Sequence, residues 1–332
     1  MNNGVVIVTY NRMELLKECL ACVCGQTIPF SRVIVVNNCS TDGTGAYLQS
    51  REDAIVLSPD AVMCSDDVSD GREEKRIWVI DETENLGGAG GFYHGLRVVR
   101  TMDLDWVLII DDDAMIAPDY MERLLEGRTA QLTAGKREVA ALAGSVWTEG
   151  RLDLSHRRRI TNRLLFVESA VEQEEYRSAF SCDCATFCGL AIAGSKMQEI
   201  GLPQKDYFLW YDDTEYCLRL QDCGGITVIP DARLDHKTTL SKEGMVAKGV
   251  LHRIGWRQYY GYRNRYDTAR AHLGKGSARC ILWQYRVFLL LSRCMMLKKS
   301  TRAQGASNVR ILRDVIQDCK TGRLGRHPSY HY

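Results

Sequence analysis

The sequence lacks a long apolar run, a dinucleotide-binding glycine motif and an excess of one charge. No uncharged apolar stretch approaches the ~18 residues that read as a membrane span, so no span is predicted. The motif GxGxxG is absent, which leaves a dinucleotide-binding domain without support. Lys and Arg number 43 against 42 Asp and Glu, a net charge of +1. This balance disfavours nucleic acid as a partner.

Cysteine is frequent but shows no metal-binding pattern. The 13 cysteines are scattered, and the CxxC of Cys19 and Cys22 has no second pair at zinc spacing. The first apolar run begins at Gly4 without a basic leader, so we expect reduced thiols and a cytoplasmic location. With 332 residues, 45% of them hydrophobic and 26% charged, the chain reads as globular, with one large or two modest domains.

The most informative stretch is WVLIIDDDA, from Trp106 to Ala114. Its apolar run predicts a strand buried on both faces, and its three carboxylates must then emerge at the strand's carboxyl end, where open α/β sheets bind ligands. Alternate residues of an extended chain share a face, so Asp111 and Asp113 are predicted to converge on Mg²⁺ or Mn²⁺ while Asp112 points elsewhere. A solvated acidic turn is the alternative interpretation.

Strands and helices alternate around this stretch, as in a doubly wound nucleotide-binding half. Strands are predicted at 5–8, 33–36 and 77–80, and Asn11 with Glu14 fits a capping box before a helix. Residues 59–75 are acidic and aperiodic, which predicts an exposed insertion. Residues 84–92 predict a glycine-rich loop that leads into a helix and lets a ligand approach the backbone; a tight structural turn is the alternative.

A second acidic set follows an aromatic run. Phe208 to Tyr211 precede Asp212, Asp213 and Glu215, which stand at the start of a predicted helix. The aromatic rings could stack on a sugar, although carboxylates in a first helical turn also interact favourably with the helix dipole. Upstream, the run Arg157 to Arg159 is expected to lie on a solvated surface. A strand is predicted at 226–230, with His236 just beyond it.

The last part of the chain, residues 266–332, differs in character. From Arg279 onward the sequence contains eleven Lys and Arg but only two acidic residues, Asp314 and Asp318. Arg279, Arg286 and Arg293 recur every seven residues among apolar side chains, which is typical of a basic amphipathic segment on an anionic membrane surface. A core-facing helix, an oligomer contact and, less well supported, nucleic acid are the alternatives.

Taken together, the motifs resemble those of the family-2 inverting glycosyltransferases with the GT-A fold, within them the bacterial galactofuranosyl- and rhamnosyltransferases. The resemblance covers about residues 5–265 through VVIVTYNR, VVNNCSTDGT, ENLGGAGGF, LIIDDDA, FCGLAIAG, GLPQKDYFLWYDDTEYCLRL, His236 and YYGYRNR. It implies an α/β GT-A domain over residues 1–265, with a nucleotide-binding half (1–115) and an acceptor half (116–265), followed by a helical tail (266–332).

The resemblance also implies roles for individual residues. Nucleotide-sugar contacts fall to Thr9, Asn11, Arg12, Asn37, Asn85, Gly87, Gly88, Asp111 and Asp112. The metal ligands would be Asp111, Asp113 and His236, with Asp113 the firmest. Asp213 matches the catalytic base, with Asp212 and Glu215 beside it, and Trp210, Tyr211 and Glu215 would shape the acceptor site. Asn37 stands where such enzymes commonly have an Asp that accepts from the uracil or thymine ring; an amide oxygen still accepts, but the charge is lost.

The implied reaction is one in-line displacement with inversion, helped by Mn²⁺ or Mg²⁺ on the diphosphate. The motifs favour UDP-galactofuranose as donor, with dTDP-rhamnose as the alternative, and a glycan or lipid-linked acceptor. A non-catalytic nucleotide-sugar-binding protein is a further alternative, as is a homo-oligomer. A processive synthase would need membrane spans and a QxxRW motif, which are missing, and a nucleotidyltransferase would not need the second acidic set.

Overall fold

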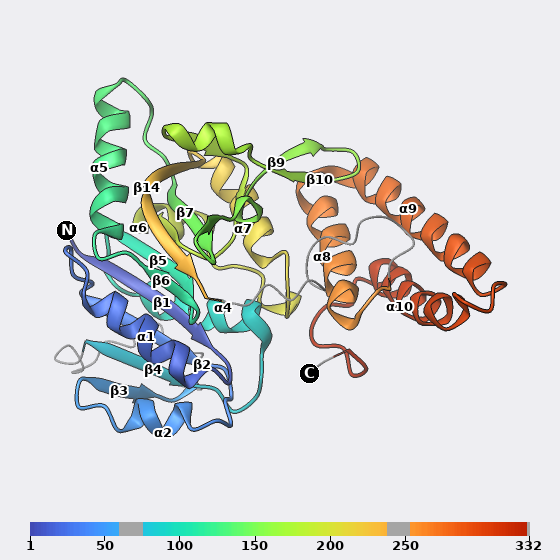
Figure 1. Cartoon of the computed structure of the whole chain (residues 1–332), viewed down its shortest axis with the longest axis horizontal. Helices are drawn as coiled ribbons and strands as arrows, with labels where there is room; N and C mark the ends of the chain where they lie inside the picture. Colours follow the sequence, from blue (N-terminus) through green and yellow to red (C-terminus); the bar gives the residue numbers. More distant parts are fainter. Residues whose placement is uncertain (60–75, 238–252, 331–332) are drawn as a thin grey trace. The chain divides into compact units, whose positions relative to one another are not determined.

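The computed structural model describes residues 1–59, 76–237 and 253–330. A large mixed sheet dominates it, in the order β11-β14-β7-β13-β5-β1-β2-β4-β3, with β6 paired to β14 and β8 to β7 (Figure 1). Its strands are β1 (Asn3–Thr9), β2 (Arg32–Asn37), β3 (Ala54–Leu57), β4 (Ile77–Asp81), β5 (Trp106–Asp111), β6 (Ala114–Ile116), β7 (Ala141–Thr148), β8 (Arg151–Leu152), β11 (Phe180–Cys182), β13 (Leu190–Ala193) and β14 (Ile226–His236). A smaller sheet joins β10 (Val167–Ala170), β9 (Arg157–Asn162) and β12 (Cys184–Ala185).

The first half of the sheet is parallel, as the alternation of strands and helices predicts. Strands β3, β4, β2, β1 and β5 run the same way, so their carboxyl ends meet at one edge. The strands β1 and β5 are buried almost throughout, which explains their continuous apolar runs. Beyond β5 the sheet becomes mixed, because β13 is antiparallel to both β5 and β7.

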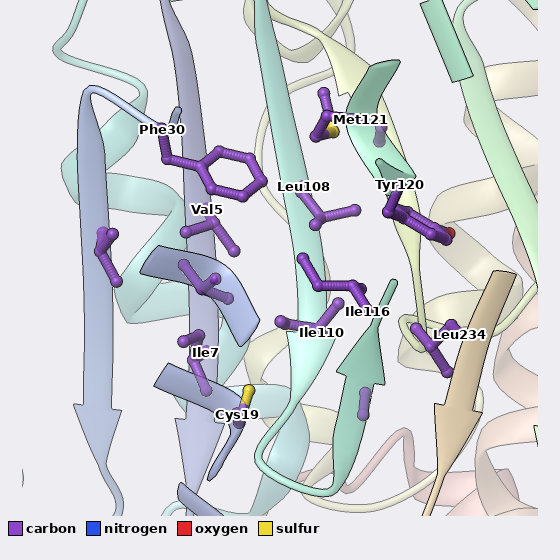
Figure 2. Close-up of a cluster of buried hydrophobic side chains, with 14 of the residues drawn as sticks. Val5, Ile7, Cys19, Phe30, Leu108, Ile110, Ile116, Tyr120, Met121 and Leu234 are labelled. Carbon is purple, nitrogen blue, oxygen red and sulfur yellow. The ribbon is translucent and has the colours of Figure 1, made fainter. Parts of the chain in front are cut away.

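Helices cover both faces of this sheet. On one face, α1 (Met13–Cys24) and α5 (Tyr120–Thr133) contribute Cys19, Tyr120 and Met121 to a core with alternate strand residues such as Val5 and Leu108 (Figure 2). On the other face lies α4 (Gly87–Val99), which contacts β1 and β2. The remaining helices beside the sheet are α2 (Thr44–Gln49), α6 (Gly194–Ile200) and α7 (Asp212–Asp222).

The expected glycine-rich loop is wrong in its extent, because the glycines from Gly87 onward lie inside α4. Their small size lets this helix pack closely on the sheet. A Cβ atom added to Gly91 would lie 2.7 Å from Cγ1 of Val8, and one added to Gly95 would collide with Val6. Gly88 differs, since a Cβ there would meet nothing within 4 Å. Gly88 thus leaves open space beside the backbone, unlike Gly90, Gly91 and Gly95.

Contacts between residues divide the chain into two units. The first holds the sheet and comprises residues 1–159, 169–205 and 213–238; the second comprises 160–168, 206–212 and 239–332. In the second unit α8 (Trp256–His272), α9 (Gly274–Met295) and α10 (Arg302–Thr321) pack on one another. The division at residue 265 that the sequence predicts falls inside α8, a continuous helix.

Two further expectations concern the outside of the fold. The predicted insertion at 59–75 lies almost wholly outside the described residues. Across the residues that are described, no helix is both long and apolar enough to cross a bilayer.

Candidate active site

The acidic stretch lies at the carboxyl edge of the sheet, as predicted. Strand β5 ends at Asp111, and its parallel neighbour β1 ends at Thr9, one residue past the partner of Asp111. The Thr9 hydroxyl donates to Oδ2 of Asp112 at 2.7 Å. The guanidinium of Arg12, just before α1, lies 3.1 Å from Asp112 and 2.5 Å from Asp113. Four residues assigned to the donor site thus surround one point.

The predicted alternation of the three carboxylates is wrong for Asp112, which was expected to point away from Asp113. It assumed an extended chain, but β5 ends at Asp111, and Asp112 and Asp113 form a turn before β6. Because the turn rotates the backbone, Asp112 and Asp113 both reach Arg12 instead of facing apart. Asp112 is therefore held by Thr9 and Arg12, which ties the turn to the end of β1.

His236 lies beside Asp113, with 3.3 Å between its Nε2 atom and the Oδ1 atom of the carboxylate. Pairing of β14 with β6 places it there, because His236 is opposite Ala114, the residue after Asp113. The ring packs edge-on against His156, whose own nitrogen contacts Asp153 at 3.5 Å. The Nδ1 atom of His236 is buried and makes no hydrogen bond to any described residue.

This part of the site concentrates negative charge. Burial, reinforced by Asp113 and Asp112, raises the pKa of Asp111 to about 7, and burial raises the pKa of Asp112 to about 6 despite Arg12. Carboxylates in such a field favour a bound cation. No group of three or more acidic, His or Cys side chains forms a metal cage within the described residues. Asp113 with His236 nevertheless fits a divalent ion that draws its remaining ligands from phosphates and water.

Asn37 at the end of β2 lies beside the carboxylate of Asp81 at the end of β4. Asn37 is 1% exposed, and its amide donates to Oδ1 of Asp81 at 2.7 Å, since the two residues are opposite each other in the parallel pair. Gln49 of α2 donates to the other oxygen of Asp81 at 3.3 Å. Sequence reasoning missed Asp81, because only the strand register brings it beside Asn37.

The turns near the predicted donor site are fixed by asparagine side chains. Asn38 accepts from the Leu86 backbone at 2.8 Å and donates to Asn85 and to the Gly87 carbonyl, so it holds the start of α4 to the end of β2. The capping box predicted at Asn11 is wrong. That residue has a φ of 54°, and its side chain accepts from the Thr41 backbone at 2.6 Å, which joins the turn after β1 to the turn after β2.

The second acidic set begins α7, as predicted. Oδ1 of Asp213 accepts from the backbone of Thr214 at 2.6 Å, and its Oδ2 atom lies 3.4 Å from a guanidinium nitrogen of Arg158. Arg158 also donates to the Thr214 hydroxyl at 3.1 Å. Glu215 is 6% exposed and pairs with Arg219 one turn later at 2.7 Å, while Asp212 is 7% exposed. Asp213 is only partly buried, so it is the most accessible of the three carboxylates.

The run Arg157 to Arg159 is not a solvated surface, so that prediction is wrong. Arg157 is fully buried and donates to the carbonyls of Gly144, His156 and Cys188, which replace water around its charge. Arg158 is the partner of Asp213 and was missed as a site residue. A basic run carries no local sign of buried acceptors, because these acceptors come from distant strands.

The second unit holds the aromatic loop, Tyr207 to Tyr211, which contains Trp210. Three of its residues, Phe208, Trp210 and Tyr211, have φ values of 64–71°, a conformation that costs energy for side chains of this size. The Asn264 amide of α8 donates to the carbonyls of Tyr207, Leu209 and Trp210 at 2.8–3.0 Å.

Arg263 and Gly261 of α8 complete this arrangement. Arg263 is 1% exposed; it donates to Oδ1 of Asn264 at 2.9 Å, which orients the amide, and to the Tyr207 carbonyl at 3.0 Å. A Cβ atom on Gly261 would lie 2.9 Å from the ring of Trp210, so the ring lies directly on this glycine. The YYGYRNR motif thus shapes the aromatic loop.

Comparison with known proteins identifies a family for the first half of the chain. Residues 4–168 match the family model described as "Glycosyl transferase family 2". The chain carries a family 2 glycosyltransferase domain. This family 2 domain extends through all the donor-side residues named above except His236.

Three curated relatives of the family 2 domain differ in the sugar they are named for. The chain is 25% identical to an undecaprenyl-phosphate mannosyltransferase of Micrococcus luteus, over 81% of this chain and 98% of the relative. It is 24% identical to galactofuranosyltransferase GlfT2 of Mycobacterium tuberculosis over 61% of this chain, which spans only 33% of that relative. It is 22% identical to the dTDP-rhamnosyl transferase RfbF of Shigella flexneri over 59% of this chain and 64% of the relative.

Solved structures confirm the predicted GT-A fold. The crystal structure of S. aureus TarS 1-349 matches 97% of this chain and 92% of its own, at 14% identity and a TM-score of 0.50. A crystal structure of GalNAc-T7 with UDP, GalNAc and Mn²⁺ matches 82% of this chain and 51% of its own, at 13% identity and a TM-score of 0.52.

Proposed function

We propose that this chain is an inverting, metal-dependent glycosyltransferase that moves galactofuranose from UDP-galactofuranose to a glycan or lipid-linked acceptor. The observation that carries the proposal is the cluster of Arg12, Asp112, Asp113 and His236 at the carboxyl edge of the sheet in a family 2 domain. Such a cluster can hold a diphosphate and its counter-ion. A binding protein without catalysis would not need Asp213 and Arg158 at a separate helix start.

The residues of the cluster have different proposed roles in binding the donor. Asp113 and His236 are the groups that would hold Mn²⁺ or Mg²⁺, with Asp111 as the nearby carboxylate that strengthens the field. When bound, the ion would offset the charge that develops on the departing nucleoside diphosphate. Arg12 supplies a fixed positive charge toward the same phosphates, and Thr9 fixes Asp112.

Asp213 is the residue we assign as general base. It accepts the proton of the acceptor hydroxyl as that oxygen attacks the anomeric carbon, and the bond to the diphosphate breaks on the opposite side. One base suffices because the leaving group is stabilised as an anion and needs no proton. Arg158 and the Thr214 backbone hold Asp213 at the start of α7, so its orientation does not depend on the acceptor.

For the nucleobase we infer that Asp81 provides the carboxylate that Asn37 lacks. A pyrimidine ring presents an N–H donor, and a carboxylate is the better acceptor for it. We expect Asp81→Asn to weaken UDP binding about tenfold, the usual size of one charge-assisted hydrogen bond. Calorimetry of UDP binding measures this, with Asp53→Asn as a matched control, because Asp53 pairs with Arg51 near the start of β3. Unchanged UDP affinity would remove Asp81 from the base site.

Rhamnose transfer from dTDP-rhamnose is the second candidate. Uracil and thymine share the ring edge that Asn37 and Asp81 would contact, so the base site does not separate the two donors. The relatives named for galactofuranose, rhamnose and mannose are all 22–25% identical to this chain, which leaves the sugar to experiment.

The experiment that tests the proposal is donor hydrolysis. The protein is incubated with Mn²⁺ and, separately, UDP-galactofuranose, dTDP-rhamnose and GDP-mannose, and release of the nucleoside diphosphate is followed. We expect slow release from UDP-galactofuranose, abolished by chelator and by Asp113→Ala. Release from dTDP-rhamnose alone would establish the second candidate. Tight UDP binding without release from any donor, with or without added lipid-linked acceptors, would support a binding protein instead.

A further inference from the structure

Helix α9 exposes one continuous stripe of side chains. Its buried residues, among them Ile281, Tyr285 and Met295, point to the side that packs on α8 and α10. The opposite side carries exposed residues spaced alternately by four and three positions, which is the spacing of one helix face. The outer stripe consists of Arg279, Trp283, Arg286, Leu290, Arg293 and Leu297.

The outer stripe alternates positive and large apolar side chains. Trp283 is 66% exposed, Leu290 is 59% exposed, and Leu297, two residues beyond the helix end, is 81% exposed. No Asp or Glu occurs anywhere in α9. Large apolar side chains exposed to water are unfavourable, and an exposed apolar surface of this kind is typical of a binding surface.

Helix α10 shows that this pattern is not a general property of the second unit. Its exposed residues include Arg313 and Lys320, and Arg323 follows it, so it is also basic. None of the large exposed hydrophobic residues of the described chain lies on α10. The combination of apolar and basic groups is therefore specific to the outer stripe of α9.

We propose that the outer stripe docks α9 flat on an anionic membrane surface. A helix parallel to the bilayer can insert Trp283, Leu290 and Leu297 among the acyl chains, while arginines between them reach the lipid phosphates. Indole rings are well suited to the boundary between headgroups and acyl chains. This surface uses none of the residues assigned to the donor or acceptor, so it goes beyond the proposed activity and can be tested without it.

Two other occupants fit the outer stripe less well. A second copy of the same stripe would bring arginines against arginines, with no carboxylate on α9 to balance them. Nucleic acid would use the arginines but would gain little from three large apolar side chains between them. An anionic lipid surface satisfies both kinds of side chain.

The test is co-sedimentation of the full chain with vesicles of phosphatidylcholine alone or mixed equally with phosphatidylglycerol. We expect binding to the mixed vesicles only. Replacing Arg279, Arg286 and Arg293 with Gln should weaken it about a hundredfold, because each charge near the surface contributes about fivefold. Replacing Trp283, Leu290 and Leu297 with Ser should weaken it at least about tenfold, and this loss should persist at high salt.

A matched control removes the same charge from α10 and its end. Arg313→Gln, Lys320→Gln and Arg323→Gln together should leave most of the vesicle binding intact. All substituted side chains are exposed, so circular dichroism should show an unchanged fold. A second readout is quenching of tryptophan fluorescence by lipids with brominated acyl chains. This quenching should fall strongly in Trp283→Phe while co-sedimentation persists.

Four results would overturn the proposal. One is that the protein binds neither kind of vesicle. A second is equal loss of binding in the α10 control, which would indicate diffuse charge attraction instead of docking through the outer stripe. A third is a dimer in light scattering that the Ser variant dissociates, without vesicle binding, which would assign the stripe to a second copy. The fourth is binding to RNA but not to vesicles, lost in the Arg variant and kept in the Ser variant.

Discussion

This chain has two acidic clusters, Asp111 to Asp113 and Asp212 to Glu215. They differ in the charged groups that surround each carboxylate. In the first cluster three carboxylates share a small volume, and burial together with their mutual repulsion raises the pKa of Asp111 and Asp112. In the second cluster Asp213 faces Arg158 and Glu215 faces Arg219. The first arrangement concentrates negative charge, whereas the second keeps single carboxylates in fixed positions. Under the proposed function, the first cluster would bind a cation and the second would transfer a proton.

The largest expected effect comes from Asp213→Asn. The amide keeps the shape and the hydrogen bond to Thr214 but cannot accept the acceptor's proton, so turnover should fall about a thousandfold. Nucleotide binding, measured by calorimetry with UDP and Mn²⁺, should stay unchanged. Asp222→Asn, an exposed position at the other end of α7, is the control and should keep full turnover. Full activity of the Asp213 variant would break the distinction between the clusters.

The matching change in the first cluster is Asp113→Asn. We expect the effect of Mn²⁺ on UDP affinity to shrink about 10- to 100-fold, because one of the two protein groups that would hold the ion loses its charge. Asp119→Asn removes a surface carboxylate that pairs with Arg123 and serves as control. If Mn²⁺ still raises UDP affinity as in the unmodified protein, the ion binds elsewhere.

A smaller effect is expected for Arg158→Gln, which sharpens the account of the second cluster. Without its partner, Asp213 keeps only the backbone hydrogen bond and loses its fixed orientation. We expect kcat to fall about tenfold while the KM for the donor stays the same. The Arg158→Lys variant keeps the positive charge, so its kcat should be a few-fold higher than that of Arg158→Gln. An equal rise in KM would instead assign Arg158 to donor binding.

The smallest change in turnover is expected for Glu215→Gln. Glu215 is buried and paired with Arg219, which also donates to the carbonyls of Ile200 and Leu202. Breaking this pair should lower the free energy of unfolding by about 2 kcal/mol, since a charge-assisted hydrogen bond is lost while Arg219 keeps its two carbonyl acceptors. Urea unfolding measures this loss. A raised KM for the acceptor at unchanged stability would instead support the role in acceptor binding that the family resemblance implies.

Much of the sheet could be predicted from the sequence because its strands are buried on both faces. The runs at β1, β2, β4 and β5 are apolar for that reason, and the position of Asp111 to Asp113 at a strand end follows from the cost of burying charge. These signals are local in the sequence, so they can be recognised without knowing which strands are neighbours in the sheet.

The failures concern residues whose partners are distant in the sequence. The sequence around Arg157 predicts a solvated side chain, but in the fold it donates to the carbonyls of Gly144 and Cys188. The contact of Asn37 with Asp81 depends on the register of two parallel strands, and Asn11 joins two turns instead of capping a helix. The glycines of α4 looked like a loop because their packing on Val8 and Val6 is a property of the folded sheet.

The way in which α8 holds the aromatic loop also orders events during synthesis. Residues 206–212 leave the ribosome well before Asn264, whose amide fixes the loop's strained backbone, and before Gly325, whose backbone donates to the Asp206 carbonyl at 2.6 Å. A nascent chain can therefore complete the parallel half of its sheet while this loop is still without its partners. The aromatic loop matures last, so a chain released early would hold the parallel half of the sheet without a finished aromatic loop.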